Sequence, residues 1–499
     1  MTRRRGGKVL FSVSPFHRVP VSWKCNQRPS ALMFNKEAVG MNNHMSDARS
    51  QTATVALVQS EVRDASEFDY PEIRKVVQEA VSLAGGLTNI IKDGDVVVLK
   101  PNIVATRGAP RLTFLDYNAY KPELQIQREM NGITTDYRVT KAVVELVREI
   151  NPSGKVYVME GSAWGQTATN FKLMGYHHDN IPGVDRFISL DDTSSYASVD
   201  SEDLVAVDLG EKGRYPASRM PHYTGGSYYF DRTYFEADVL ISIPVLKNHL
   251  YTGMSGGIKN VSIGATPCMV YGNNRNRITR IKKIHHSWGP LNDWIHDYYL
   301  CRPVDFVVTD GLQGSQNGPR AQGSSSVENA LMNMRLILAG QDAVAVDTIH
   351  SYIVGIDAQK VDHLRELAAS GAGVIDTRHI LVKGNRRVDE VKKIFKLSRI
   401  LAVLFRGRKS QYRDFEPPEF ELVNVMLSDN NLSADTKTGP NVTKVELFID
   451  GELSWVFSDG FDHIEVALDG SLMEGAREAT FYAYDRYLNC SFRTARLGG

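Results

Sequence analysis

The chain has 499 residues, of which 42% are hydrophobic and 23% charged, a composition that is typical of soluble globular proteins. Lys and Arg together number 58, and so do Asp and Glu, so no excess positive charge points to a nucleic acid or an anionic membrane as a partner. No apolar run reaches the roughly 18 residues that a transmembrane helix requires. A chain of this length usually forms about two or three domains.

The four cysteines are too far apart for a local Cys-x-x-Cys zinc site or a ferredoxin-type iron–sulfur cluster. We therefore predict that each is a buried or free thiol. They are Cys25, Cys268, Cys301 and Cys490.

The N-terminal segment is basic, with eight Lys or Arg in the first 36 residues and no acid before Glu37. Two interpretations stay open: a transit-peptide-like leader or a mis-called start, for which Met33, Met41 and Met45 are alternatives. We expect residues 1–50 to be disordered and outside the fold. The compartment is cytoplasmic by default, because no secretory signal is visible, whereas a C-terminal β-sandwich (below) would suit the cell envelope.

From Thr54 onward, short apolar strands alternate with amphipathic helices, which predicts an α/β domain over residues 51–387. Strands on which both faces are apolar indicate a mainly parallel sheet covered by helices on both faces. The predicted strands are 54–59, 95–99, 155–159, 204–207, 239–243, 304–309, 336–338 and 380–382. The predicted helices are 71–84, 137–150, 290–300, 343–354 and 361–370.

A second domain is expected at the C-terminus. Residues 388–405 have the pattern of a cationic helix, so 388–415 would be a basic helical linker, and Glu416-Pro417-Pro418-Glu419 resembles a hinge. Short alternating strands with Gly and Asp turns predict a small all-β sandwich over 416–499. These strands are 420–427, 444–449, 454–457, 463–468 and 479–484.

The runs VELFIDGE and EVALDGSLMEGAREATFYAYDRYLNCS in this region resemble bacterial immunoglobulin-like modules. The resemblance covers about the last 60 residues. It implies a spacer or a surface for docking to another protein, without chemistry of its own.

Polar residues follow several predicted strands at their C-terminal ends, which in a parallel sheet meet along one edge. We therefore expect one cleft there. Taken singly, Lys100 and Lys247 could be exposed strand ends, and Asp310 could merely cap a turn. The residues concerned are Lys100, Asn102, Glu160, Lys247, His249 and Asp310.

The segment 238–264 is the predicted centre of this cleft. Its strand ends at Pro244, and we expect a flexible loop to follow, built around Ser255-Gly256-Gly257 and carrying Lys259 and Asn260. A lysine held away from water can become an uncharged nucleophile, and a nearby histidine such as His249 titrates near neutrality.

Asp347 lies within a predicted apolar helix, where it is either a ligand or a buried carboxylate with hydrogen-bond partners. By residue type, His249, Asp310 and Asp347 could bind a divalent metal. The basic run 275–283, followed by His285-His286 and Trp288, could contact phosphate or form a solvated loop.

The motifs LKPNIV, ISIPVLKNH, GGIKNVSIG, VVTDGLQGSQNGP and ILAGQDAVAVDTI resemble domain-of-unknown-function family 362 over residues 54–383. Some members of that family carry ferredoxin-type cysteines, which this chain lacks.

A more distant similarity is to nickel-pincer lactate racemases, in which a histidine and a cofactor-bearing lysine flank a Ser-Gly-Gly turn. It implies Lys259 as the tether of a nickel cofactor and His249 as a proton-transfer base. Other histidines of those racemases have no clear counterpart here, unless His285 or His286 fills one role.

Two classes of function fit these residues. In the first, the chain is an enzyme with isomerase-like acid/base chemistry, acting by proton transfer on a small anionic or carboxylate-bearing substrate. His249, Lys259 and Lys247 would be catalytic, and Lys100, Asn102, Glu160, Asn260 and Asp310 would bind the substrate. In the second, it is a non-catalytic anion-binding protein docked through its β-sandwich.

Overall fold

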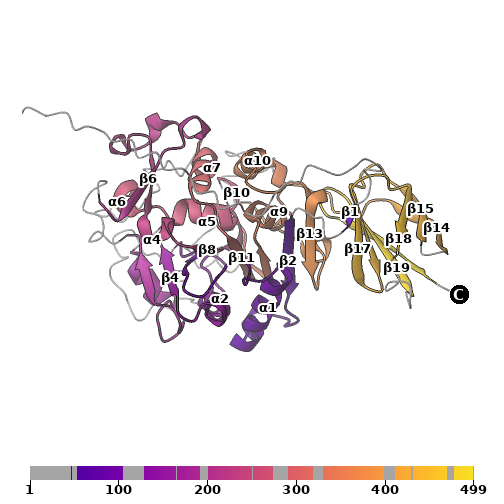
Figure 1. Ribbon diagram of the computed structural model, residues 1–499, viewed down its shortest axis with the longest axis horizontal. Helices are drawn as coiled ribbons and strands as arrows, with labels where there is room; N and C mark the ends of the chain where they lie inside the picture. Colours follow the sequence, from indigo (N-terminus) through magenta and orange to yellow (C-terminus); the bar gives the residue numbers. More distant parts are fainter. Residues whose placement is uncertain are drawn as a thin grey trace, which may run out of the picture. The chain divides into compact units, whose positions relative to one another are not determined.

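Among the residues that the structure describes, ten strands of the α/β region form one mixed sheet (Figure 1). The sheet is mostly parallel. Strand β12 is antiparallel to both of its neighbours, β10 is antiparallel to β9, and all the other pairs are parallel. The order is β13 (Ile380–Gly384), β2 (Ala53–Gln59), β12 (Leu331–Gly340), β11 (Phe306–Ser315), β8 (Val239–Ile243), β3 (Val96–Pro101), β4 (Lys155–Glu160) and β5 (Arg186–Ser189), with β9 (Val245–His249) beside β11 and β10 (Gly253–Met254) beside β9.

This structure is a computed structural model, and the chain divides into the units Met1–Asn43 and His44–Gly499. All described residues belong to the second unit. They are residues 46–47, 53–104, 129–163, 166–191, 201–249, 251–272, 290–318, 330–397, 411–428, 431–468 and 477–497.

Helices cover both faces of the sheet, as predicted. Side chains alternate along a strand, so Val97 and Leu99 pack with α1 (Tyr70–Leu83) and α2 (Tyr137–Ile150), whereas Val98 packs on the opposite face. That second face is covered by α5 (Gly256–Gly264), α7 (Leu291–Cys301), α9 (Ala343–Ile353) and α10 (Asp362–Ala369).

Helix α1 shows why these segments become helical. The Asp69 side chain accepts a hydrogen bond from the backbone N–H of Glu72, and Pro71 occupies the first turn, where its missing N–H costs nothing. The buried positions recur at helical spacing and face the sheet. They are Ile73, Val76, Val77, Ala80 and Val81.

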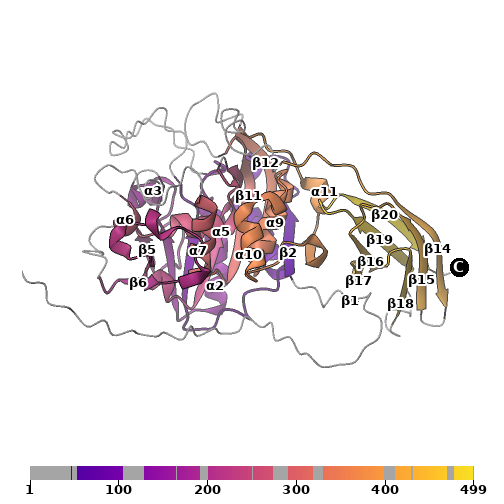
Figure 2. The same ribbon diagram turned by 90° about the horizontal axis from the view of Figure 1, so that it is seen from above.

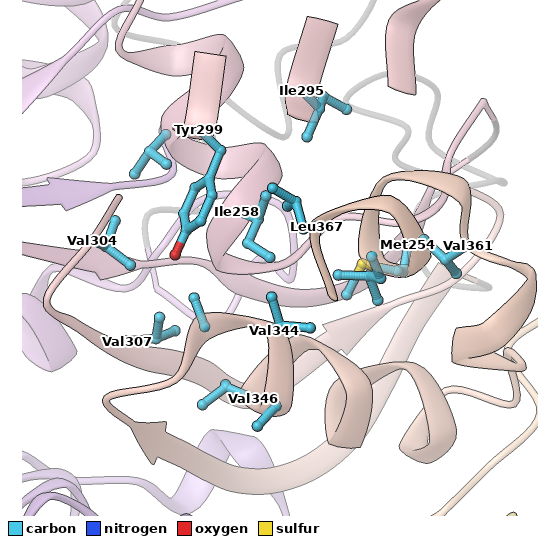
Figure 3. Close-up of a cluster of buried hydrophobic side chains, with 14 of the residues drawn as sticks. Met254, Ile258, Ile295, Tyr299, Val304, Val307, Val344, Val346, Val361 and Leu367 are labelled. Carbon is cyan, nitrogen blue, oxygen red and sulfur yellow. The ribbon is translucent and has the colours of Figure 1, made fainter. Parts of the chain in front are cut away.

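Helix α5 lies in the apolar layer that the second-face helices share. Figure 3 shows Ile258 of α5 in one cluster with side chains of α7, α9 and α10 and with Val307 of β11. Ile258, Ile295 and Val344 are each 0% exposed. The face of α5 that carries Ile258 is therefore filled by apolar contacts. The next two residues, Lys259 and Asn260, project from other faces of the helix.

Two sequence predictions about this region are wrong. The segment after Pro244 is not a flexible loop: Lys247 and His249 lie on strand β9, and Lys259 and Asn260 lie on helix α5. Strand β11 continues past Thr309 to Ser315, so Asp310 lies within it. Residues 204–207 form a strand, as predicted, and this strand, β6 (Leu204–Val207), pairs with β7 (Tyr228–Asp231) in a separate two-stranded sheet.

The cationic helix predicted over residues 388–405 is shorter where the structure describes it. Helix α11 covers only Val388–Val391, after which the chain forms neither helix nor strand up to residue 397. The N–H groups of Lys393 and Phe395 donate to the carbonyls of Ile353 and Val354, and Phe395 is 0% exposed. These contacts with the end of α9 replace the helical hydrogen bonds.

The C-terminal strands form two antiparallel sheets over a shared apolar core, consistent with a small β-sandwich (Figure 2). One sheet is β14 (Phe420–Ser428), β15 (Asn431–Thr438) and β18 (His463–Ala467). The other is β1 (Ser46–Asp47), β17 (Glu452–Phe457), β16 (Lys444–Ile449), β19 (Glu478–Tyr484) and β20 (Cys490–Arg496). Strand β1 corrects the expectation that residues 1–50 lie wholly outside the fold, because it pairs with Val456 and Trp455.

The remaining elements are short. They are η2 (Ala65–Glu67), α3 (Thr167–Leu173), η4 (Gly210–Lys212), η5 (Ala217–Arg219), η6 (His222–Thr224), α4 (Arg232–Phe235), α6 (Cys268–Tyr271), η10 (Ala358–Lys360) and η11 (Thr377–His379). No helix among the described ranges combines the length and the apolarity that crossing a membrane would take. Cys268, Cys301 and Cys490 are thiols that form no disulfide, as predicted, and Cys25 lies outside the described residues.

Candidate functional site

A buried ion pair joins the ends of two neighbouring parallel strands. Lys100 of β3 and Glu160 of β4 lie 2.8 Å apart, Nζ to Oε2, and their side chains are 0% and 2% exposed. Glu160 also accepts the backbone N–H groups of Ile103 and Gly161. A charge pair without access to water is stable only when further hydrogen bonds satisfy it, and these two N–H groups supply such bonds to the Glu160 carboxylate.

Two asparagines and a second lysine extend this pair into a network. Asn260 of α5 accepts from Lys100 Nζ at 3.3 Å and from Asn102 Nδ2 at 3.0 Å, and its own amide donates to the carbonyl oxygen of Lys100. Lys247 of β9 donates to the side-chain oxygen of Asn102 and to the carbonyl of Ile133. We call Lys100, Asn102, Glu160, Lys247 and Asn260 the polar network.

The structure thus brings together five of the predicted site residues, and it decides one open alternative. Lys100 and Lys247 are not exposed strand ends, since they are 0% and 1% exposed. Burial, together with the nearby positive charge of Lys259, holds the pKa of Lys247 well below its usual value. Lys247 is therefore a hydrogen-bond donor inside the protein, engaged by two described oxygens.

Lys259 differs from the other two lysines. It is 8% exposed, and its amine makes no hydrogen bond or ion pair with any residue in the described ranges. Burial lowers its pKa to about 7, because the charged form loses water without gaining a partner. Together with burial, its charge lowers the pKa of Lys247 on β9 and of His363 on α10.

His249 lies two residues beyond Lys247 on β9, so the two side chains project from the same face of that strand. Nδ1 of His249 accepts from the backbone N–H of Tyr251 at 3.2 Å, and the hydroxyl of Thr252 is equally close. A ring nitrogen that accepts a backbone N–H carries no proton, so neutral His249 holds its proton on Nε2.

Asp347 is a buried carboxylate with partners, one of the two interpretations of the sequence. Its oxygens accept the N–H groups of Gly257 and Ile258 at 2.7 and 3.1 Å, so it caps the first turn of α5. Gly256 has φ +91, and a Cβ there would lie 2.5 Å from the Asp347 carboxyl group. Burial raises the pKa of Asp347 to about 7 despite these bonds.

Asp310 does more than cap a turn, because its side chain accepts hydrogen bonds from backbone N–H groups of two segments. It accepts the N–H of Asp136, the residue before α2, at 2.8 Å, and the N–H of Leu312 at 3.1 Å. Burial and the neighbouring charge of Asp136 raise the pKa of Asp310 to about 7. Its charge is also felt at Lys247, which places it beside the polar network.

No group of three or more His, Cys, Asp or Glu side chains able to hold a metal ion occurs among the residues described above. His249, Asp310 and Asp347 are therefore not gathered into a metal site, because the two aspartates serve backbone N–H groups at separate places. The basic run 275–283, His285, His286 and Trp288 lie outside the described residues.

Two histidines beside the site were missed by the sequence analysis. Nε2 of His350 accepts the backbone N–H of Lys247 at 3.2 Å, and Nδ1 of His363 lies 2.9 Å from Oδ1 of Asn292. Burial lowers the pKa of each to about 3, so both are neutral. His350 lies in the apolar helix α9 and His363 in the first turn of α10, and the pattern of neither helix indicated the site.

The fold and this site define an α/β protein with a lysine-rich buried network at the carboxyl ends of its parallel strands. Residues 119–351 match the family described as Domain of unknown function (DUF362), so the chain is similar to that family over most of the main domain. The matched stretch contains Glu160, Lys247, Lys259 and Asn260, whereas Lys100 precedes it.

No curated protein sequence matches the chain. Two solved structures show a weak similarity. The M60 catalytic domain from Clostridium perfringens ZmpC in complex with the sialyl T antigen is 15% identical with a TM-score of 0.15, over 31% of this chain and 32% of that one. The Clostridium perfringens spore cortex lytic enzyme SleM is 9% identical with a TM-score of 0.16, over 86% of this chain and 76% of that one.

The chain therefore spans about a third of the first of these structures. At such TM-scores neither similarity bears on the fold or the function of this protein. The DUF362 match supports the sequence-based assignment of the main domain, and the site geometry carries the functional argument.

Proposed function

We propose that this protein is an enzyme that moves a proton on a small carboxylate-bearing substrate, with Lys259 as the base. One observation supports this above the others: Lys259 is a buried amine that no described residue engages, whereas Lys100 and Lys247 are both bonded. A pKa near 7 leaves much of the amine neutral at physiological pH, as a general base requires.

His249 is the proposed proton donor. Its proton on Nε2 complements a neutral Lys259, so one residue can accept a proton while the other gives one. This reverses the role that the resemblance to racemases implies, in which His249 is a base.

The polar network has a positioning role in this proposal. Lys100 and Glu160 fix Asn260, which is the next residue after Lys259 on α5. Burial lowers the pKa of Lys259 and so favours its neutral amine, and burial together with the charge of Lys259 in turn lowers the pKa of Lys247. The predicted direct contact of Lys100 with substrate is not part of this proposal, because its ammonium is already bonded within the network.

The test uses small 2-hydroxy, 2-oxo and 2-amino carboxylic acids in ²H₂O, with proton NMR to follow exchange at the carbon next to the carboxylate. The wild-type chain is expected to exchange that proton in at least one compound. Lys259→Met is expected to lose exchange about 100-fold or more, as removal of a general base does. Lys75→Met, a change at an exposed residue of α1, is the matched control and should exchange normally.

A non-catalytic anion-binding protein is the alternative, and the same unpartnered amine supports it, since an anion would relieve the repulsion between Lys247 and Lys259. Thermal-shift measurements on the same compounds separate the two. A binding protein would be stabilised by a carboxylate without exchanging its proton, and Lys259→Met would lose the stabilisation. That outcome would overturn the enzyme proposal, as would exchange that survives in Lys259→Met.

The nickel-pincer similarity suggests a further possibility that the residues fit only in part. The unpartnered amine of Lys259 could carry a covalently attached cofactor, which would supply the metal and an aromatic ring to the reaction. His249 fits less well, because its Nδ1 already accepts from Tyr251. Intact-mass and metal analysis decides the point: an adduct on Lys259 with stoichiometric nickel would support it, and an unmodified, metal-free chain that exchanges protons would exclude it.

A further inference from the structure

A second group of catalytic residue types lies on α7 and α10, and the proposed function does not use it. Ser370 caps the C-terminal end of α10, while His296 and Asp297 are consecutive residues of α7. Nε2 of His296 lies 3.0 Å from Oγ of Ser370, and Nδ1 of His296 lies 2.7 Å from Oδ1 of Asp297.

The protonation of His296 follows from the bonds of Asp297. The other carboxylate oxygen accepts the N–H groups of Arg214 and Tyr215, at 2.6 and 2.7 Å, and the hydroxyl of Tyr228 at 2.6 Å. Burial and the bond to Asp297 raise the pKa of Tyr228 above its ordinary value, so Tyr228 keeps its proton and donates it. Asp297 thus only accepts, and neutral His296 must place its proton on Nδ1.

The lone pair of Nε2 then faces the Ser370 hydroxyl. His296 and Asp297 are 1% and 0% exposed, whereas Ser370 is exposed. Buried Asp297 therefore orients buried His296, and His296 in turn faces the exposed hydroxyl of Ser370. This is the arrangement of acid, base and hydroxyl that activates a serine as a nucleophile. The hydroxyl can also turn to the carbonyl of Glu366, 2.9 Å away, so it has two acceptors at hand.

We propose that Ser370, His296 and Asp297 form a second, nucleophilic site that accepts the acyl group of a small ester. The Ser370 oxygen attacks the ester carbonyl carbon while His296 Nε2 takes the hydroxyl proton. The bond from that carbon to the alcohol oxygen breaks, and His296 returns the proton to the leaving alcohol. Water then hydrolyses the acyl-serine by the same transfers, so the net reaction is ester plus water to acid plus alcohol.

A structural role for these contacts makes a different prediction. Asn292 and His296 lie one turn apart on α7 and bond to His363 and Ser370 of α10, so they could simply join the two helices. In that case Ser370 would be an ordinary hydroxyl, and only stability would change when it is removed.

The test treats the full chain with an alkyl fluorophosphonate at neutral pH and locates the adduct by peptide mass spectrometry. Ser370 is expected to be labelled at least about 100-fold faster than Ser82, an exposed serine of α1. Ser370→Ala should lose the adduct, and Ser82→Ala should keep it. His296→Gln, compared with wild type by circular dichroism, should fold and lose most of the labelling.

A second measurement tests the proposal with a smaller compound, in case the fluorophosphonate is too large to reach Ser370. Hydrolysis of p-nitrophenyl acetate by Ser370→Ala is expected to fall to the level of buffer plus residual amine reaction, with Ser82→Ala unchanged. Labelling of Ser370 no faster than Ser82, together with equal ester hydrolysis by wild type and Ser370→Ala, would overturn the proposal. Neither outcome depends on proton exchange at Lys259, so the two proposals fail separately.

Discussion

Lys100 and Glu160 form an ion pair that solvent does not reach, with 2.8 Å between Nζ and Oε2. The pair lies at the carboxyl ends of β3 and β4, which are neighbours in the sheet. Its bonds to the backbone after both strands and to Asn260 of α5 make it the element that connects the sheet edge to the helix bearing Lys259.

Replacing Glu160 with Gln is therefore expected to be costly. The change keeps the shape of the side chain but leaves the Lys100 ammonium buried without its counter-charge, which should lower the free energy of unfolding by about 3–5 kcal/mol. Urea unfolding followed by circular dichroism measures it. Lys75→Gln removes one partner of an exposed pair with Glu72 and should change stability little; equal effects of the two changes would contradict the role of the buried pair.

The amine of Lys259 is expected to react at a pH at which ordinary lysines do not. Only the neutral amine is a nucleophile, so modification by acetic anhydride or cyanate should rise as the pH passes about 7 and then level off. An ordinary exposed lysine, with a pKa of about 10.4, keeps gaining reactivity to well above pH 9. Peptide mass spectrometry after brief labelling at several pH values compares the two, and parallel curves would show that Lys259 titrates normally.

Asp347 should make stability depend on pH in a defined direction. Its pKa is raised from 3.8 to about 7 in the folded chain, so between these values the folded state holds a proton that the unfolded state has lost. Stability therefore falls as the pH rises from about 4 to 7. Asp347→Asn removes this contribution, so the stability advantage of wild type over the variant should shrink by on the order of 2–4 kcal/mol across that window.

Urea unfolding of both proteins at closely spaced pH values measures this difference. Asp310, whose pKa is also raised to about 7, is present in both chains and cancels in the comparison. A difference that does not vary with pH would mean that Asp347 ionises equally in the folded and unfolded chain.

Gly256→Ala tests the close approach between α5 and α9. The new Cβ would meet the Asp347 carboxyl group at 2.5 Å, and the backbone there has φ +91. Gly86→Ala is a matched control, because Gly86 has φ +71 but nothing within 4 Å of the added carbon. We expect Gly256→Ala to lose about 1–3 kcal/mol more than Gly86→Ala in urea unfolding, and equal losses would assign the whole cost to the backbone.

The sheet was predictable because its strands are apolar on both faces, as Val97 and Val98 of β3 illustrate. The meeting of Lys100, Glu160 and Lys247 was also predictable, since parallel strands end along one edge of a sheet. Their functional roles stay predictions, as do the domain boundaries and the immunoglobulin-like character of the C-terminal sandwich.

What the sequence concealed depends on contacts between distant segments. Gly256 and Gly257 suggest a loop, but Asp347, ninety residues away, caps them as the start of a helix. Gly311 suggests the end of β11, yet a Cβ there would lie 2.9 Å from the carbonyl oxygen of Leu336, so a glycine lets β12 continue beside it. Phe395 is buried and bonded to the end of α9 in a segment that is not helical, where a helix was expected.

The cap that Asp347 places on α5 also determines what can draw an anion toward Lys259. Since the N–H groups of Gly257 and Ile258 are already taken, attraction must come from lysine charge, which at Lys259 disappears as the pH rises through about 7. Binding of a carboxylate would favour the protonated amine, whereas removal of a proton from it requires the neutral one. These opposite requirements would confine turnover to a narrow range of pH near neutrality, with substrate held more tightly on its acidic side.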